Sequence, residues 1–375
     1  MVIHLSIFSI IILCSLIWER SIRHKKLVRI YNGESYYFKS NIMPWLIVFG
    51  YFTFLAAMRS NINDTAAYIS SFEALGTTWE DFWGQVSTFA TGKDWAFDAI
   101  SIIFKIFISD NYHLWFLMYA TIESLIIIHV CRRYSVSFLD TCFFFFCSTL
   151  YHNYFTMMRQ WFAVVIIFAA IGLMKERKTF AYIIVCIAVA QIHMSAYLMI
   201  VVYFLVRNKV WSRKQNLLVL VFAIAMFFFD PIISDLNAVF SDFTYSYVLE
   251  TMSAGNGSSP VRILIALVPV ILAFIGRKRI NPNDNILNIC INMSVINVLL
   301  NILAMFTSGL FIIRFSTYTN IFNLLLYPYL LNVLYTGRNK TIIKSAFYIF
   351  YFAFYIYQMN YGSAWGYASD ILGTF

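Results

Sequence analysis

The chain has 375 residues, of which 61% are hydrophobic and 12% are charged, and its mean hydropathy is +0.72. A soluble domain carries about 25% charged residues, so this composition excludes an ordinary soluble fold and predicts a polytopic membrane protein. The formal net charge is +9, but the basic residues fall in short clusters between apolar runs, which argues against nucleic-acid binding. We expect an all-α bundle that forms one transmembrane domain over residues 1–375.

The apolar runs predict about twelve spans, each covering most or all of the roughly 30 Å hydrocarbon layer. The predicted spans are residues 2–18, 42–58, 113–131, 136–150, 157–174, 179–192, 194–206, 216–230, 261–276, 286–306, 310–335 and 342–359. The first run is followed directly by Glu19 and Arg20 and lacks a small-residue cleavage pattern, so we expect a retained span and not a signal peptide.

Two long connections interrupt the predicted bundle, at residues 59–112 and 231–260. The first contains an apolar stretch, 95–108, which carries Asp98 and Lys105. Charges at these positions disfavour a full span, so we predict an interfacial or re-entrant helix there. The second connection is rich in turn-forming residues and suits a mobile outer loop.

The distribution of basic residues predicts the orientation of the spans. With the N-terminus outside, 21 of the 27 lysines and arginines fall on the cytoplasmic side, where such residues are retained. Both termini are then expected outside. The six basic residues left on the outer side are isolated ones: Arg59, Lys93, Lys105, Arg159, Arg262 and Arg314.

The first polar cluster, Arg59 to Tyr68, follows the second predicted span. Asp64 is placed to cap a helix, with Tyr68 one turn further on the same face. One interpretation is therefore a capped helix with an interfacial arginine. The other is a polar rim, in which the carboxylate binds a hydroxyl-rich substrate or takes its proton.

Two further clusters lie at the outer ends of predicted spans. Arg159 and Gln160 enter the fifth span, where they are either interfacial anchors or a pair of donors suited to an anionic group such as phosphate. His193 lies at the tip of the hairpin between residues 179–192 and 194–206. A packed structural histidine is the plainer interpretation, and proton transfer or contact with phosphate is the functional one.

A fourth cluster places Arg314 inside an apolar run, with Tyr318 one turn away. An arginine there cannot easily reach the interface, which favours a functional role in substrate binding. Four asparagines in the preceding span recur at intervals of four and five residues: Asn288, Asn292, Asn297 and Asn301. This stripe either bonds helices together or lines a wet cavity.

Several motifs are absent from the sequence. There is no phosphate-binding loop, no H-E-x-x-H and no G-x-S-x-G, so a nucleotide-driven pump or a membrane metalloprotease is unsupported. The six cysteines lie within or at the ends of apolar runs without metal-ligand spacing, and predict neither disulfides nor zinc. We therefore expect no cofactor and no metal ligand set, while a divalent cation is left open.

Four segments of the chain resemble the EpsG-like family of bacterial exopolysaccharide polymerases, whose role is similar to that of the Wzy polymerases. They are R-S-N-I-N-D-T-A-A-Y after the second span, W-A-F-D-A-I-S-I-I-F-K-I-F, M-M-R-Q-W-F-A and A-Q-I-H-M-S-A. The resemblance covers residues 40–210, and beyond them rests mainly on hydropathy and on R-F-S-T-Y at residues 314–318.

The resemblance implies a multipass glycosyltransferase of the GT-C type in the bacterial inner membrane, with its active site facing the periplasm or exterior. Its substrate would be an undecaprenyl-pyrophosphate-linked oligosaccharide, extended by transfer onto an incoming repeat unit. Its surroundings would be membrane lipid, and the protein partners that the resemblance implies are a chain-length regulator and a flippase. A flippase or exporter of the same lipid-linked glycan is the alternative, and an O-acyltransferase is a weaker one.

On this hypothesis Asp64 is the catalytic base, while Arg159 and His193 stabilise charge at the reaction centre. The substrate-binding residues would be Arg59, Tyr68, Gln160, Arg314 and Tyr318. Aromatic side chains on the outer side could also stack against sugar rings. They are Trp79, Trp83, Tyr151, Tyr154, Tyr245 and Tyr247.

Overall fold

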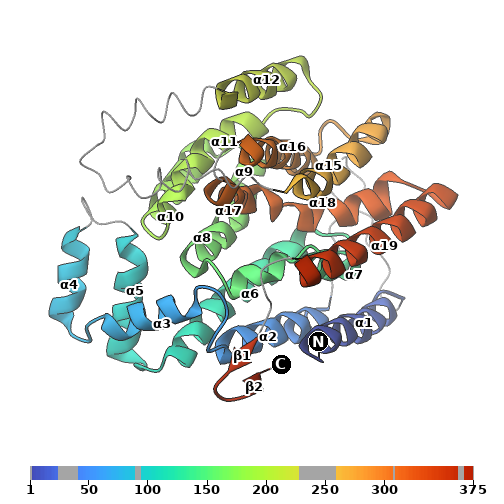
Figure 1. Ribbon diagram of the computed structural model, residues 1–375. Coiled ribbons are helices and arrows are strands. Elements are labelled where there is room, and N and C mark those ends of the chain that lie inside the picture. Colours follow the sequence, from blue (N-terminus) through green and yellow to red (C-terminus); the bar gives the residue numbers. More distant parts are fainter. Residues whose placement is uncertain are drawn as a thin grey trace.

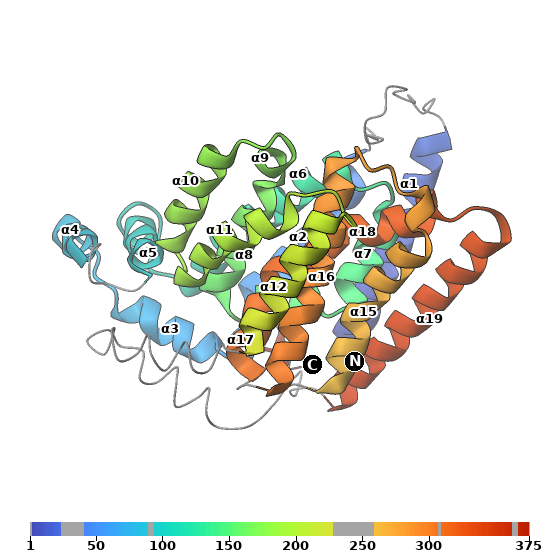
Figure 2. The ribbon, with the colours of Figure 1, turned by 90° about the horizontal axis from the view of Figure 1, so that it is seen from above.

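The computed structural model describes residues 2–23, 41–88, 94–227, 259–306, 309–361 and 367–374. Most of these residues are helical, and the all-α prediction is confirmed. Figures 1 and 2 show α1 (Val2–Arg23), α2 (Met43–Met58), α6 (Tyr112–Tyr134), α7 (Phe138–Cys147) and α19 (Gly337–Tyr361) in one part of the bundle. In the same views α4 (Trp79–Ser87) and α5 (Trp95–Phe107) project at one side, next to α3 (Thr65–Ala74).

The remaining helices complete the bundle. They are α8 (Met158–Ala169), α9 (Ile171–Lys175), α10 (Thr179–Ala190), α11 (Leu198–Val206), α12 (Arg213–Phe227), α15 (Pro260–Ile275), α16 (Asn285–Phe306), α17 (Gly309–Asn320) and α18 (Asn323–Tyr329). Short 3₁₀ turns lie at Leu150–Tyr154, Met194–Tyr197 and Arg277–Arg279, and a π-helical turn lies at Leu330–Leu334.

Each of the twelve predicted spans falls on helical structure, and most ends agree within a few residues. Within the described ranges, three helical segments are long and apolar enough to cross a membrane by length and composition: Tyr112–Tyr134, Met158–Lys175 and Asn285–Met305. Seven shorter apolar helices accompany them. The count of twelve spans and the GT-C type stay predictions.

The predicted span 310–335 is not one continuous helix. The helix ends at Asn320, restarts as α18 and passes into the π-helical turn at Leu330–Leu334. The change to the π-helical turn follows Pro328, which has no N–H to continue the α-helical hydrogen bonds, and Asn332 Nδ2 bonds back to the Pro328 carbonyl at 2.8 Å. Apolar composition alone does not reveal this break.

The core is dominated by aromatic side chains, and α7 is its centre. The four consecutive phenylalanines Phe143–Phe146 are all buried, so α7 is apolar on every side and must be surrounded by protein. Phe145 packs edge-on against Phe52 of α2, with ring centroids 5.3 Å apart. Tyr151 and Tyr154 are each 2% exposed in this core, so the prediction that they offer outer faces to sugars is wrong.

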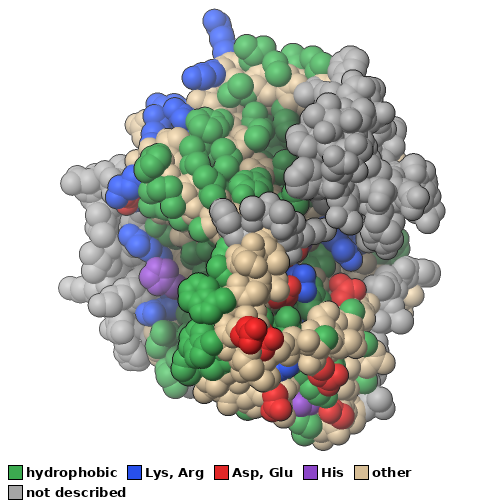
Figure 3. All heavy atoms as spheres, turned by 90° about the vertical axis from the view of Figure 1, so that its left-hand side faces the viewer, with side chains coloured by type: hydrophobic (Ala, Val, Ile, Leu, Met, Phe, Trp, Pro, Cys, Tyr) green, Lys and Arg blue, Asp and Glu red, His purple; other side chains and the backbone are tan. Residues whose placement is uncertain are grey.

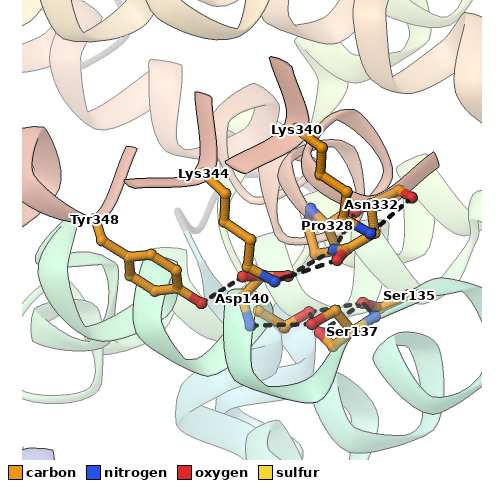
Figure 4. Close-up of polar contacts among 9 residues, drawn as sticks. Ser135, Ser137, Asp140, Pro328, Asn332, Lys340, Lys344 and Tyr348 are labelled. Carbon is orange, nitrogen blue, oxygen red and sulfur yellow. Dashed lines mark hydrogen bonds and ion pairs between the residues drawn. The ribbon is translucent and has the colours of Figure 1, made fainter. Parts of the chain in front are cut away.

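One end of α7 carries a closed polar cluster (Figure 4). Asp140 is fully buried in the first turn, and its carboxylate accepts from Lys344 Nζ at 3.1 Å, Asn332 Nδ2 at 2.6 Å and Tyr348 OH at 2.5 Å. These partners come from α19 and the π-helical turn. Asp140 therefore bonds three segments together around one buried charge.

The connection 59–112 is built around α3, α4 and α5. Lys105 of α5 donates to the carbonyls of Phe72 at 2.9 Å and Leu75 at 2.7 Å, at the end of α3. A cation there satisfies the free carbonyls of a helix C-terminus, which accounts for a lysine in an apolar stretch. The helix predicted at 95–108 is present as α5, and its depth in a membrane stays a prediction.

The other predicted outer connection, 231–260, lies outside the described residues except for Ser259 and Pro260, as do Tyr245 and Tyr247. Near the C-terminus, β1 (Ala368–Ser369) and β2 (Gly373–Thr374) form a short antiparallel hairpin. Ala368 also bridges to Asn61, which the sequence analysis did not predict. The end of the chain is thus attached to the loop that precedes α3.

Candidate functional site

Six of the eight site residues predicted from the sequence line one cavity of about 380 Å³, which we call the carboxylate cavity. It is lined by Asp64, Ala67, Tyr68, Ser71, Asp94, Met157, Arg159, Gln160, His193 and Arg314. These residues come from α3, α8, α17 and the two turns before α5 and after α10. Clusters up to 250 residues apart in the sequence therefore meet in one place.

Asp64 occupies the N-cap position of α3, as the sequence predicted, but its side chain makes no capping hydrogen bond. The capping interpretation is therefore wrong for the side chain. One carboxylate oxygen lies 3.9 Å from Arg314 Nη2, and both side chains are about two-fifths exposed. This long and open ion pair leaves Asp64 accessible to a ligand in the cavity.

Arg159 lies in the first turn of α8 and is held by α5. Its Nη2 lies 3.1 Å from Asp98 Oδ1, and its guanidinium lies over the Phe97 ring, 5.0 Å from the centroid. Burial raises the pKa of the Asp98 carboxyl, although Arg159 opposes that shift. Arg159 Nε is buried without a hydrogen-bond partner among the described residues, so a donor stays open beside the cavity.

Two turns bring His193 and Asp94 together at the cavity. His193 caps the 3₁₀ turn after α10, and its Nδ1 lies 3.0 Å from Ser195 Oγ. Asp94 Oδ1 accepts from the Met194 backbone N–H at 3.0 Å. The sequence analysis missed Asp94, although it immediately precedes the W-A-F-D segment that carries the family resemblance.

Gln160 fixes the backbone next to Arg314. Its Nε2 donates to the Arg314 carbonyl at 2.8 Å, which ties α8 to α17. Tyr68 OH accepts from the Arg159 backbone N–H at 3.4 Å, which ties α3 to α8. Both residues line the cavity, and both also set the relative positions of the helices that carry the charges.

Two predicted residues, Arg59 and Tyr318, do not line the cavity. Arg59 is 1% exposed; its guanidinium lies 3.6 Å from the Phe116 ring centroid and bonds to the Ala56 carbonyl. Tyr318 is fully buried, and its hydroxyl accepts a hydrogen bond from Ser195 Oγ at 3.2 Å. Ser195 stands two residues after His193 in the chain. The structure places Arg59 in the core and Tyr318 behind the turn that carries His193, and a role for either in substrate binding stays a prediction.

A second cavity of about 320 Å³, the amide cavity, adjoins the first and shares Met157 and Arg314 with it. Its polar lining consists of Asn63, Ser148, Thr149, His152, Asn153, Thr156, Arg262, Asn297, Asn301, Ser316, Thr317, Asn320, Asn323, Tyr351 and Gln358. Aspartate and glutamate are absent from the described part of this lining. Arg314 thus separates a cavity with two carboxylates from one with amides and hydroxyls.

The four asparagines of α16 fall into two pairs. One pair bonds helices together and the other lines a cavity, which are the two roles that the sequence left open. Asn288 bonds to the Val210 backbone N–H at 2.8 Å, and Asn292 bonds to the Val206 and Asn208 carbonyls at 3.0 and 2.9 Å. These two hold the helices together. Asn297 and Asn301, further along the same face, line the amide cavity.

Backbone strain is concentrated around the cavities. In the described part of the chain, six residues other than glycine have a positive φ. Four of them line one of the two cavities: Asn63, Asp94, Thr149 and Met157, at φ values of 45°, 57°, 63° and 49°. Such conformations are costly for most side chains and are common at functional sites.

Charged side chains are unevenly distributed over the face of the molecule on the side of α3, α4 and α5 (Figure 3). Its acidic side chains gather in the lower half of the view, and basic side chains lie among and above them. Trp79 and Trp83 of α4 are 50% and 63% exposed and remain available for contact with lipid or sugar. Among the residues the structure describes, no group of three or more histidine, cysteine, aspartate or glutamate side chains could hold a metal ion.

Comparison with known proteins gives one match. No curated protein and no solved structure matches the chain, but the model of the EpsG family matches residues 42–369. The match includes every residue that lines the two cavities. It covers nearly the whole chain, and the protein therefore belongs to the EpsG family.

Proposed function

We propose that this membrane protein is a polysaccharide repeat-unit polymerase. It moves a growing glycan from undecaprenyl pyrophosphate to a hydroxyl of an incoming lipid-linked repeat unit, at the outer leaflet of the bacterial inner membrane. The EpsG family supports a role of the polymerase type. The observation that carries the proposal is the carboxylate cavity, in which a carboxylate, a histidine and two arginines meet.

The proposed reaction is a direct displacement at the anomeric carbon. The acceptor hydroxyl oxygen forms the new glycosidic bond, while the bond to the diphosphate oxygen breaks and the lipid diphosphate leaves with the electron pair. Asp64 accepts the hydroxyl proton. Since substitution occurs from the opposite side, the configuration at that carbon is inverted.

The arginines would act on the charge that develops on the leaving group. Arg314 lines both cavities and is the first candidate to bind the diphosphate, because its side chain is 44% exposed. Arg159 and His193 line the carboxylate cavity beside Asp64, where they would stabilise charge at the reaction centre. Gln160 and Tyr68 hold these groups in position through the backbone contacts described above.

The test is glycan synthesis by the purified protein in proteoliposomes that contain undecaprenyl-pyrophosphate-linked repeat units. We expect wild type to produce a ladder of longer glycans, and Arg314→Ala to slow it by about 10²–10³-fold, as loss of one preorganised donor does. Arg277→Ala is the matched control, because Arg277 packs on Phe274 and lines neither cavity. Movement of repeat units across the bilayer without any ladder would instead establish the transport alternative.

A further inference from the structure

The two cavities differ in charge, although they share Arg314. The carboxylate cavity contains Asp64 and Asp94 beside Arg159 and Arg314, so its formal charges cancel when histidine is neutral. Arg159 is in addition paired with Asp98 at 3.1 Å. Among the residues that the structure describes, the amide cavity is lined by Arg262 and Arg314 and by no acidic side chain. It is therefore the more electropositive of the two.

A lipid-linked sugar diphosphate carries two negative charges at neutral pH. Bringing them into a water-poor site is expensive unless cations with no other partner are present. Carboxylates near the diphosphate would raise that cost through repulsion. On charge alone, the diphosphate belongs on the amide side of Arg314, within reach of Arg262.

The geometry of the proposed reaction leads to the same side. In a direct displacement, the attacking hydroxyl and the leaving oxygen lie on opposite sides of the anomeric carbon. If Asp64 takes the proton from the hydroxyl in the carboxylate cavity, then the leaving diphosphate points away from that cavity. Met157 and Arg314, which line both cavities, mark the junction where the anomeric carbon would lie.

The remaining lining of the amide cavity suits the sugar next to the diphosphate. Carboxamides can both donate to and accept from neighbouring sugar hydroxyls. Asn297, Asn301 and Asn320 present such groups, and Tyr351 and Phe354 add aromatic surface. A hydroxyl is also unsatisfied here, since the buried Oγ of Ser148 has no hydrogen-bond partner among the described residues.

We propose that the amide cavity is the donor site, in which Arg262 and Arg314 bind the diphosphate of the lipid-linked glycan while the carboxylate cavity receives the acceptor hydroxyl. Neither Arg262 nor this division of the cavities follows from the sequence. The assignment of donor and acceptor rests on the proposed function. Binding of a diphosphate by Arg262 does not, because it requires no turnover.

The first experiment measures binding without catalysis. Polyprenyl diphosphate, polyprenyl monophosphate, inorganic pyrophosphate and phosphatidylglycerol are titrated against the protein in detergent. We expect wild type to bind polyprenyl diphosphate most tightly, and Arg262→Gln to weaken that binding by about tenfold or more, since a charge-assisted contact is lost. Equal affinity of Arg262→Gln and wild type for the diphosphate would overturn the proposal, and so would a preference for phosphatidylglycerol.

Two controls separate binding from folding. Arg277→Gln removes an arginine that lines neither cavity and should bind like wild type. Arg262→Lys keeps the charge but loses the planar pair of donors, so it should recover part of the affinity. If Arg262→Gln unfolds, Arg262→Lys decides: an affinity equal to that of wild type contradicts the need for a guanidinium at this position.

The second experiment separates donor from acceptor. The donor is a lipid-linked repeat unit whose acceptor hydroxyl is blocked, and the acceptor is a lipid-free repeat-unit oligosaccharide. Arg262→Gln should raise KM for the donor by about tenfold and leave KM for the acceptor unchanged. A change confined to the acceptor would reverse the assignment of the cavities. Wild type that binds polyprenyl diphosphate but transfers nothing would defeat the proposed function and leave the diphosphate site standing.

Discussion

The polar groups at the two ends of α7 differ in how completely they are hydrogen-bonded. At the Asp140 end, a fully buried carboxylate is bonded to Lys344, Asn332 and Tyr348 (Figure 4). Just beyond the other end, Ser148 lines the amide cavity and its buried hydroxyl has no partner among the described residues. A saturated cluster stabilises a fold, whereas polar groups that are left open next to a cavity are available to a ligand.

The same contrast applies to the arginines on the other side of the site. Arg59 has its charge enclosed by an aromatic ring and a carbonyl and is 1% exposed. Arg314 lies 3.9 Å from a carboxylate oxygen of Asp64, and its side chain is 44% exposed. From the sequence, both residues were predicted to bind substrate. Their surroundings in the fold distinguish them.

The largest effect is expected from Asp64→Asn, because it removes the proposed base and keeps the size of the side chain. Loss of a general base reduces a rate by about 10²–10⁴-fold. The ladder assay should show that loss with little change in donor binding, since Asp64 lines only the carboxylate cavity of the two. Full activity of Asp64→Asn would transfer the role of base to Asp94 or His193, to be tested by the same substitution strategy.

Next in size is Lys344→Met, which tests the closed cluster. It removes the cation beside a fully buried carboxylate, and breaking such a pair costs about 3–5 kcal/mol. The free energy of unfolding in detergent should fall by this amount or somewhat less, because Asn332 and Tyr348 still bond to Asp140. The double variant Asp140→Asn with Lys344→Met should recover part of the loss.

Measuring activity per folded molecule separates an effect of Lys344→Met on stability from an effect on function. Glycan synthesis by Lys344→Met, normalised to folded protein, should equal wild type, because Lys344 lines neither cavity. A loss of synthesis without a loss of stability would show that the closed cluster takes part in function, and the contrast between the ends of α7 would fail.

The sequence predicted much of the helical architecture because apolar runs are the direct consequence of burial in lipid or in a bundle. It also identified Asp64, Arg159, His193 and Arg314, since isolated charges in or beside such runs are costly. It did not separate Arg59 from these residues. Both arginines were expected to bind substrate, and the contact that encloses Arg59 comes from Phe116, which is distant in the sequence.

Other features depend on contacts that local patterns do not encode. Arg262 is one isolated basic residue among several in the sequence, and it becomes notable only when α15 and α17 line the same cavity. The interruption of 310–335 falls between α17 and α18, at residues 321–322, and the apolar pattern does not mark it. The C-terminal hairpin reaches the loop before α3 through Ala368 and Asn61, about 300 residues apart.

The smallest expected effect comes from Asp370 in that hairpin, the exposed counterpart of Asp140. Tyr112 donates to its carboxylate at 2.6 Å and His113 lies 3.0 Å away, while the Asp370 side chain is 51% exposed. The hydrogen bond from Tyr112 is the main cause that holds the pKa of Asp370 below its ordinary value. Exposed pairs of this kind contribute about 0.2–1 kcal/mol, because water screens them.

The sign of the pH dependence follows from the lowered pKa. A carboxyl with a lower pKa in the folded state adds stability above its unfolded pKa, about 3.9, and loses that contribution as the pH falls through the folded value. Asp370→Asn should therefore unfold slightly more easily than wild type at pH 6, and the difference should shrink below about pH 4. A thermal unfolding series over this range, with Asp110→Asn as the exposed control, would contradict the prediction if the difference stayed constant. A constant difference would mean that Asp370 attaches the hairpin by shape and packing, and not through its charge.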